Sequence, residues 1–259
     1  MKKFSNIVLI IALAFVVLGN ILFWGPRLYR NIKADELDKN IGNKKYETEG
    51  FIDSIEANIE AADVNIILSD SFSCYFENLD LSRSDAYVSE GILHINARNY
   101  ENMEVLGWNL GNGIDAGAKA KVTIAVPDDM LRSLKLEAGS GTIDIESISA
   151  ENLVIQLGSG NLSVTGIKVT ENGAVQLGGG SAKIYSLDAR NMSIRTGVGN
   201  IDVRLASGIE RYDISASVAT GEIELPGTYE FGIDRNVKKA GDGTKLLTVE
   251  SGAGSIAVR

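Results

Sequence analysis

The sequence predicts an all-β protein that winds as a parallel β-solenoid, a β-helix with coils of about 19 or 20 residues. One unit recurs: an alternating apolar strand, a Gly-x-Gly turn, a second alternating strand and a short loop. This unit occurs four times, at residues 134–145, 153–164, 174–184 and 192–203. The second glycines of the four copies, Gly141, Gly160, Gly180 and Gly199, lie 19, 20 and 19 residues apart. That period is too short for a pair of helices and is typical of stacked strand coils.

Alternation within each unit predicts one buried and one exposed face. Ile143 and Ile145 project to one side of a strand and Asp144 to the other. A single coil cannot bury its apolar face, so stacking of the next coil must create a continuous core. We therefore expect Ile143, Leu162 and Ile201 to line a dry interior.

The turn glycines are predicted structural residues, because a corner of a coil needs either a positive φ angle or a close approach of neighbouring coils. They are Gly139, Gly141, Gly158, Gly160, Gly178, Gly180, Gly197 and Gly199. Two looser copies surround Gly221 and Gly254, and the longer gaps before them predict loops or irregular turns. The last strand, residues 255–258, is expected to leave an open edge for pairing with another chain.

Ahead of the repeats, an apolar run from Ile7 to Trp24 predicts one transmembrane helix. At ~1.5 Å per residue a helix there covers about 27 Å, close to the thickness of a hydrocarbon core. A cleaved signal peptide is the alternative, but no small-x-small cleavage site follows the run. We expect an uncleaved anchor at residues 7–24 behind a short cytoplasmic tail, residues 1–6.

The flanking charges bear on orientation in the membrane. Lys2 and Lys3 favour a cytoplasmic N-terminus, whereas Arg27, Arg30 and Lys33 oppose it. We expect a single-pass protein of the cell membrane, in contact with the lipid bilayer, with the bulk of the chain extracytoplasmic. Residues 25–50 are then a juxtamembrane linker, either an amphipathic stalk or a solvated tether.

Residues 51–126 carry strand signals without the strict repeat and predict an irregular β region of the solenoid. The signals lie at residues 55–59, 64–68, 74–76, 86–88, 92–95 and 121–126. Residues 99–117 are glycine-rich and aperiodic, which predicts a long loop or insertion. Pro127 ends one strand before the regular repeats of residues 127–259, because proline lacks an amide donor.

Composition excludes several classes of function. The chain has 34 acidic and 25 basic residues, and residues 1–33 hold five of the bases and no acid. Residues 34–259 therefore hold 20 bases and 34 acids, a formal charge of −14. Because binding of DNA or RNA depends on an excess of Lys and Arg that neutralises phosphates, no nucleic-acid partner is expected. Cys74 is the single cysteine, which rules out an intramolecular disulfide and a cysteine-built metal centre.

The Gly-x-Gly turns also differ from a calcium-binding nonapeptide repeat. That repeat needs Asp two residues after the second glycine. The corresponding positions here are Ile143, Leu162, Ala182 and Ile201. No metal site is predicted.

Other motifs that could carry chemistry lack the necessary context. Residues 111–116 imitate a dinucleotide fingerprint without a βαβ unit around it. His94 reads as a solvated strand residue and Cys74 as a small apolar one. Asp128–Asp129 and Asp234–Arg235 read as solvated loops. We therefore predict no catalytic residue and no cofactor.

The segment Val122–Pro127, followed by Leu134–Ile145 and its later copies, resembles the bacterial putative-adhesin family, a β-strand-repeat domain of unknown function. The similarity extends over residues 51–259. It implies a parallel β-solenoid, often behind a single membrane span, in Gram-positive envelopes and in some cases encoded beside envelope-stress signalling systems. It implies no catalytic residue.

Two functional hypotheses follow. The first is a non-enzymatic, membrane-anchored envelope protein that binds a protein or a wall polymer, in stress sensing or adhesion. The alternative is a polysaccharide hydrolase or lyase that acts in a groove of the β-helix, for which a cluster of acids is needed.

Overall fold

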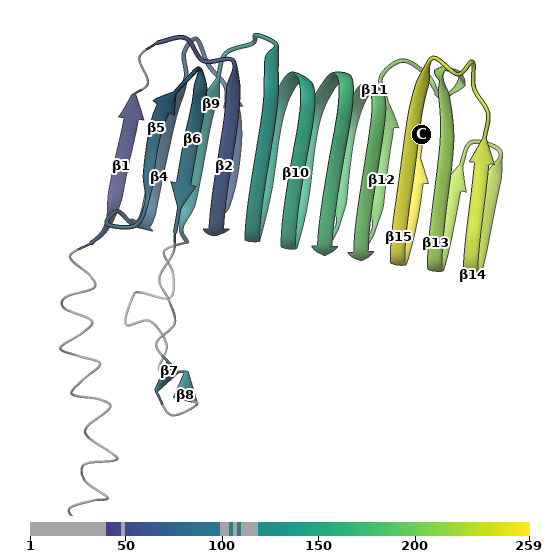
Figure 1. Ribbon diagram of the computed structural model, residues 1–259. Helices are drawn as coiled ribbons and strands as arrows, with labels where there is room; N and C mark the ends of the chain where they lie inside the picture. The colour runs from purple at the N-terminus through teal and green to yellow at the C-terminus, as the bar shows by residue number, and fades with distance from the viewer. Residues whose placement is uncertain (1–39, 48–49, 99–103, 106–107, 110–118) are drawn as a thin grey trace, which may run out of the picture. The chain divides into compact units, whose positions relative to one another are not determined.

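The computed structural model describes residues 40–47, 50–98, 104–105, 108–109 and 119–259. Two compact units divide the chain, and residues 42–99 with 119–259 form the larger one (Figure 1). The predicted tail and membrane span, residues 1–24, lie outside the described part of the chain. Within the described ranges, no helix is both long enough and apolar enough to cross a bilayer.

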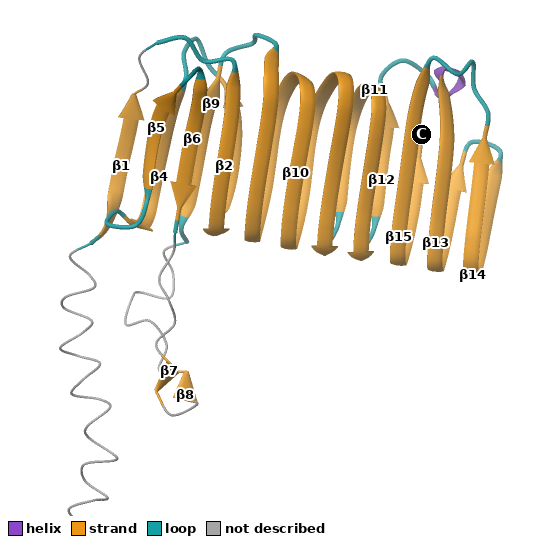
Figure 2. Ribbon diagram, viewed as in Figure 1, coloured by secondary structure: helices purple, strands orange, loops and turns teal. Residues whose placement is uncertain are grey.

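Strands make up almost all of the described structure (Figure 2). The one helical segment among the described residues is the 3-10 turn η1 (Ile209–Arg211). The strands are β1 (Ile41–Glu47), β2 (Ser54–Ala61), β3 (Asp63–Leu68), β4 (Ser73–Asp80), β5 (Asp85–Ser89), β6 (Ile92–Ala97), β7 (Glu104–Val105), β8 (Trp108–Asn109), β9 (Lys121–Val126), β10 (Leu131–Gly179), β11 (Ala182–Val198), β12 (Ile201–Leu205), β13 (Tyr212–Leu225), β14 (Thr228–Lys239) and β15 (Lys245–Val258).

The regular repeats wind as stacked coils. β10 spans 49 residues because its corners remain extended, so one strand passes through several coils (Figure 1). Its last part pairs in parallel with β11, with Leu162 opposite Ala182 and Gln176 opposite Arg195. Its first part pairs in parallel with β2 and then with β3. The prediction of an all-β, mostly parallel array is confirmed.

A single apolar core fills the coils. Ile143, Leu162 and Ile201 are all buried in it, as the alternation predicted. Outward neighbours such as Asp144 are exposed, so each strand has one dry and one wet face. The apolar side chains of each coil are therefore buried by contact with the coils next to it.

The strand signals of residues 51–126 are confirmed as β2–β6 and β9. β9 ends at Val126, directly before Pro127. The expected loop at residues 99–117 lies largely outside the described residues. Of that segment the structure describes β7 and β8, which pair antiparallel with each other.

At the C-terminal end of the stack the coils are not in sequence order. The spatial order is β11, β12, β15, β13, β14 (Figure 1). Leu247 of β15 pairs with Met192 on one side and with Ile214 on the other. After β12 the chain skips one coil position, forms β13, reverses in β14 and returns to fill the gap with β15.

The expectation that residues 255–258 leave an open edge is therefore wrong. Ile256 pairs with Ile201 and with Ile223, so the last strand lies in the middle of the array. The outer edge at this end is β14, which runs antiparallel to β13 after the turn at Pro226–Gly227.

At the N-terminal end, as at the C-terminal end, the parallel strands give way to an antiparallel strand near the edge. β9 lies between β3, which is parallel to it, and β4, which is antiparallel. β5 and β6 form an antiparallel hairpin through Glu90 and Gly91, both of which have positive φ. β1 is the outer strand here, beside β4, although its residues fall within the expected linker of residues 25–50.

Candidate functional site

The first glycine of each turn stands in a column along one layer of the coils. A methyl group on Gly158 would lie 2.4 Å from the carbonyl oxygen of Gly139, and one on Gly178 would lie 2.4 Å from that of Gly158. Gly197 and Gly252 continue the column with the same spacing. All five glycines are exposed, so the column is a strip of the surface without side chains.

The second glycine of each turn forms a parallel column at the corner itself. The φ angles there run from +119° to +146°, a region that side chains rarely allow. A methyl group on Gly160 would lie 1.8 Å from the carbonyl oxygen of Gly141. This column ends with Gly254 on Gly199 and Gly221 on Gly254, which repeats the exchanged coil order.

Side chains after the corner connect one coil to the next. Asp63 accepts a hydrogen bond from the amide of Thr142 (2.9 Å) in the adjacent coil. Asn161 accepts one from the amide of Ser181 (3.1 Å) in the same way. Asn200 repeats the contact further along the stack. These bonds satisfy backbone donors where the corner interrupts the ladder.

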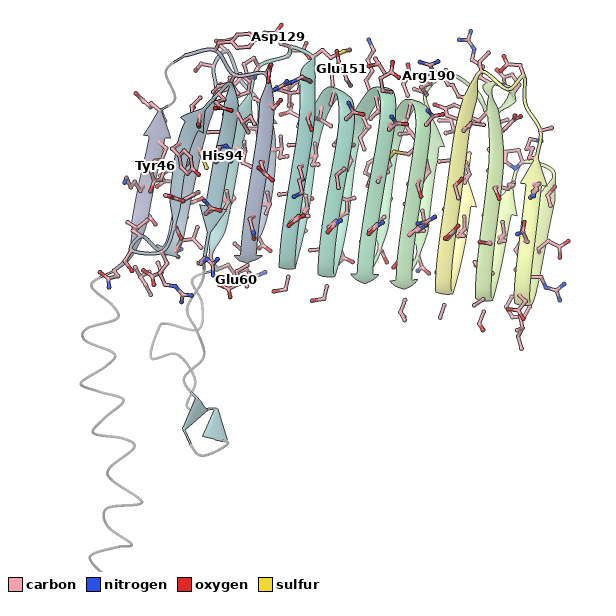
Figure 3. The ribbon with its side chains drawn as sticks, in the orientation of Figure 1. Tyr46, Glu60, His94, Asp129, Glu151 and Arg190 are labelled. Atoms are coloured by element: carbon pink, nitrogen blue, oxygen red, sulfur yellow. The ribbon has the colours of Figure 1, made fainter. Side chains whose placement is uncertain are left out.

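A groove follows the first glycine column. Two open hollows of about 610 and 770 Å³ share Gln176 and Leu177, so together they form one trough across the coils. Glu60 and Arg98 line one end, and Figure 3 shows Glu60 at the corner end of β2. Asp234 and Arg235 line the other end. We call this trough the glycine groove.

One wall of the glycine groove is a row of polar side chains, one from each coil. Strand register places Glu137 beside Asn58, Gln176 beside Arg195 and Arg195 beside Glu250. Gln156 of the intervening coil also lines the trough. Each position in the row is thus set by the same place in the repeat.

Ion pairs balance the charges of this wall. Arg195 Nε lies 2.8 Å from Glu250, and Lys135 Nζ lies 3.0 Å from Glu137. Hydrogen bonds to Glu137 and then to Glu56 raise the pKa of Lys135. The lining residues hold four carboxylates (Glu60, Glu137, Asp234, Glu250) and three guanidinium groups (Arg98, Arg195, Arg235).

The arrangement suits hydrogen bonding to an extended chain. Amide groups of Gln156 and Gln176 can each donate and accept. The bare glycine floor lets a ligand approach the sheet closely. Aromatic rings are absent from the lining residues of both hollows, so the groove offers no stacking platform.

Most of the residues for which the sequence analysis predicted no chemical role lie outside the groove lining. His94 stacks on Tyr87 with ring centroids 5.0 Å apart, and its Nδ1 is 3.5 Å from Glu56, away from the groove lining (Figure 3). Cys74 is fully buried, and this burial raises the pKa of its thiol to about 12. Asp128 and Asp129 are exposed.

Two residues belong to the groove although sequence reasoning placed them in a solvated loop. Asp234 and Arg235 line its far end, brought there by the reversal of β14. The repeated glutamines, Gln156 and Gln176, were the signal available in the sequence, since they occupy the same place in two coils.

No cluster of three or more His, Cys, Asp or Glu side chains that could hold a metal ion occurs in the ranges that the structure describes. The dinucleotide-like residues 111–116 lie outside those ranges. The eight predicted turn glycines occupy the two columns described above.

Comparison with known proteins gives a family and several distant structures. The model of the family described as Toastrack DUF4097 matches residues 52–258. No curated protein matches the chain.

Three solved structures illustrate the distant similarity. A "putative cell adhesion protein" from Clostridium sporogenes is 13% identical, with 84% of this chain and 98% of that one covered at a TM-score of 0.45. A "putative adhesin" from Bacteroides fragilis is 14% identical, with coverage of 85% and 98% and a TM-score of 0.35. A "putative lipid binding protein" from Parabacteroides distasonis is 16% identical, with coverage of 84% and 94% and a TM-score of 0.32.

Proposed function

Because this chain belongs to the Toastrack DUF4097 family, we propose that it is a non-enzymatic binding protein of the bacterial cell envelope. In this proposal residues 7–24 anchor the chain in the cell membrane and the coils lie on the extracytoplasmic side. The glycine groove holds a linear wall polysaccharide. Adhesion or the sensing of envelope stress then follows from occupancy of the groove.

The main support for the proposal is that the groove is continuous across the coils. The two hollows share Gln176 and Leu177, and the glycine column runs beneath both. Neighbouring strands lie about 4.8 Å apart, so the wall presents a polar side chain at regular short intervals. A polymer with hydroxyl and amide groups along its length matches such a row better than a compact ligand does.

The charge of the groove selects among wall polymers. Its carboxylates and guanidinium groups nearly cancel, and the protein as a whole carries a net charge of −9. A polyanion needs an excess of Lys and Arg for binding, which this surface lacks. A glycan strand without phosphate groups is the better fit.

The geometry gives no comparable support to a hydrolase or lyase. Glycoside hydrolysis uses two carboxyl groups on either side of the bond that breaks. Two of the four carboxylates that line the groove, Glu137 and Glu250, already pair with Lys135 and Arg195. Their place in the groove favours binding of a chain over cleavage.

The test is co-sedimentation of the full chain, held in detergent micelles, with insoluble wall glycan from which anionic polymers have been removed. Gln176→Trp fills the middle of the groove from an exposed position, so retention should fall at least tenfold. Thr165→Trp, exposed on the other layer of β10, is the matched control and should bind as the parent does. Equal retention of all three proteins would rule the groove out as the binding site.

A further inference from the structure

A third hollow, of about 570 Å³, lies at the N-terminal end of the stack. The sheet divides there into two branches, β3–β9–β4–β1 and β2–β6–β5, and the turn from β4 to β5 joins them (Figure 1). The hollow is lined by β1, by that turn and by the end of β6. We call it the N-terminal pocket.

Positive charge predominates in the N-terminal pocket. Lys44, Arg83 and Arg98 line it, and Asp85 is the one carboxylate among its described lining residues. Asp85 already accepts a hydrogen bond from the side-chain amide of Asn96 at 2.9 Å. The glycine groove, in contrast, holds four carboxylates and three guanidinium groups. The pocket is therefore a local concentration of cations on an acidic protein.

Hydrogen bonds hold the walls of the pocket together. The hydroxyl group of Tyr46 donates to the carbonyl oxygen of Ser84 at 3.2 Å, which connects β1 to the turn. Ser84 Oγ accepts a hydrogen bond from the amide of Arg98 at 2.9 Å, which connects the turn to the end of β6. Asp80 accepts hydrogen bonds from the amide and hydroxyl groups of Ser82 at 3.0 and 2.6 Å, so this buried carboxylate stabilises the turn. Walls fixed in advance lower the cost of ordering them around a ligand.

Two of the cations are available to a ligand. Lys44 and Arg98 are exposed, and neither forms an ion pair with a carboxylate in the part of the chain that the structure describes. Lys44 Nζ instead lies 4.3 Å from the centre of the Tyr46 ring. On the groove wall, by comparison, Arg195 pairs with Glu250. An anion that enters the pocket therefore displaces no carboxylate from Lys44 or Arg98.

We propose that the N-terminal pocket binds a phosphate group, supplied by the headgroup of an anionic phospholipid. Guanidinium groups donate paired hydrogen bonds that match the oxygens of a phosphate group, and the ammonium group of a lysine adds a point charge. A carboxylate has only two oxygens and so engages fewer of the three cations. Phosphate is therefore the anion that fits this lining best.

The position of the pocket favours a lipid as the source of the phosphate group. Lys44 follows Trp24, the last residue of the proposed anchor, by 20 residues, a segment that spans at most about 70 Å. A basic pocket held this close to a bilayer is attracted to its anionic headgroups. The choice of a lipid rests on the membrane anchoring proposed above, whereas the affinity for phosphate does not.

Hydrogen exchange of the full chain in lipid nanodiscs tests the proposal. Amides of residues 41–47 and 81–85 should exchange at least threefold more slowly when the discs contain phosphatidylglycerol than when they contain phosphatidylcholine alone. Lys44→Gln should remove most of this difference. Lys183→Gln is the matched control and should retain it, because Lys183 is also exposed and lies 5.1 Å from the centre of the Tyr185 ring, outside the lining of the pocket.

Inorganic phosphate distinguishes the two sources of the phosphate group. In equilibrium dialysis of the full chain in neutral detergent, the parent and Lys183→Gln should bind phosphate saturably, and Lys44→Gln should bind it at least fivefold more weakly. Such binding without any effect of phosphatidylglycerol would overturn the lipid source and assign the pocket to free phosphate.

Two results would overturn the site itself: no response of the parent to either probe, or equal losses in Lys44→Gln and Lys183→Gln. Lys44 does not line the glycine groove, so Lys44→Gln should co-sediment with wall glycan as the parent does. A failure of groove binding is thereby distinguished from a failure of the N-terminal pocket.

Discussion

The hydroxyl group of Tyr212 accepts a hydrogen bond from the backbone amide of Ala189 at 3.1 Å. The same hydroxyl donates to the carbonyl oxygen of Leu187 at 3.3 Å. Tyr212 begins β13 and the other two residues lie in β11, so this fully buried side chain bridges the position that β15 fills. The ammonium group of Lys245, the first residue of β15, lies 5.3 Å from the centre of the ring.

Tyr212→Phe should lower the free energy of unfolding by about 1–3 kcal/mol, because the buried amide of Ala189 loses its partner. The measurement is urea denaturation followed by circular dichroism. Tyr75→Phe removes a hydroxyl from a partly exposed ring and should change stability by less than about 0.5 kcal/mol. An equal effect of the two substitutions would show that the bridge contributes nothing.

Gly160→Ala should destabilise the coils severely. The new methyl group would lie 1.8 Å from the carbonyl oxygen of Gly141, at a residue with φ of +132°. A φ in this sparsely populated region costs an alanine of the order of 1–3 kcal/mol, and the clash with backbone adds to this cost. Thermal melting should show a large decrease in Tm or loss of the folded protein.

Gly179→Ala is the matched control for the glycine experiment. Gly179 lies in the turn of the next coil, but a methyl group there meets no atom within 4 Å and its φ is not positive. Its Tm should stay within a few degrees of the parent value. A similar loss in both variants would contradict the assignment of strain to the corner column.

Removal of residues 245–259 should unfold the C-terminal end of the stack rather than trim it. β15 pairs with β11 and β12 on one side and with β13 on the other, so its loss opens an apolar gap. Limited proteolysis should degrade the chain beyond β12 and leave the earlier coils resistant. Arg259→Ala, which breaks exposed pairs with Asp202 and Glu224, should cost less than about 1 kcal/mol.

Cys74 should make stability fall at alkaline pH. Burial raises the pKa of its thiol from 9.0 to about 12, so the folded protein holds this proton where the unfolded chain has lost it. Stability from this group is complete below pH 9 and decreases as pH rises towards 12, by at most about 1.4 kcal/mol per pH unit. The measurement is the difference in urea midpoint between the parent and Cys74→Ala from pH 8 to 11. A difference that does not narrow with pH would contradict the prediction.

The coils could be predicted because the sequence signals of each coil lie within its own repeat. Alternation at Ile143 and Leu162 identifies the buried face, and the spacing of Gly141 and Gly160 identifies the length of a coil. Both are local properties of the chain. The core residues therefore followed from periodicity alone.

The order of the last coils and the groove could not be predicted in the same way. Gly221 and Gly254 occupy the same kind of turn, and the residues around each glycine do not indicate which coil will lie next to it in the stack. Their order depends on β14 and the distant pairing of β15. The groove was missed because Gly158 and Gly178 were read as corner residues, whereas their exposure on the outer surface follows from the register of the stacked coils.

The position of β15 has a consequence for biosynthesis. A nascent chain emerges with its N-terminal part first, and its early coils can form before synthesis ends. The space between β12 and β13 stays vacant until β15, which follows β14 in the chain, has been made, so a product that stops before β15 keeps apolar surface accessible to proteases. Synthesis of β15 is thereby coupled to the survival of the coils around it.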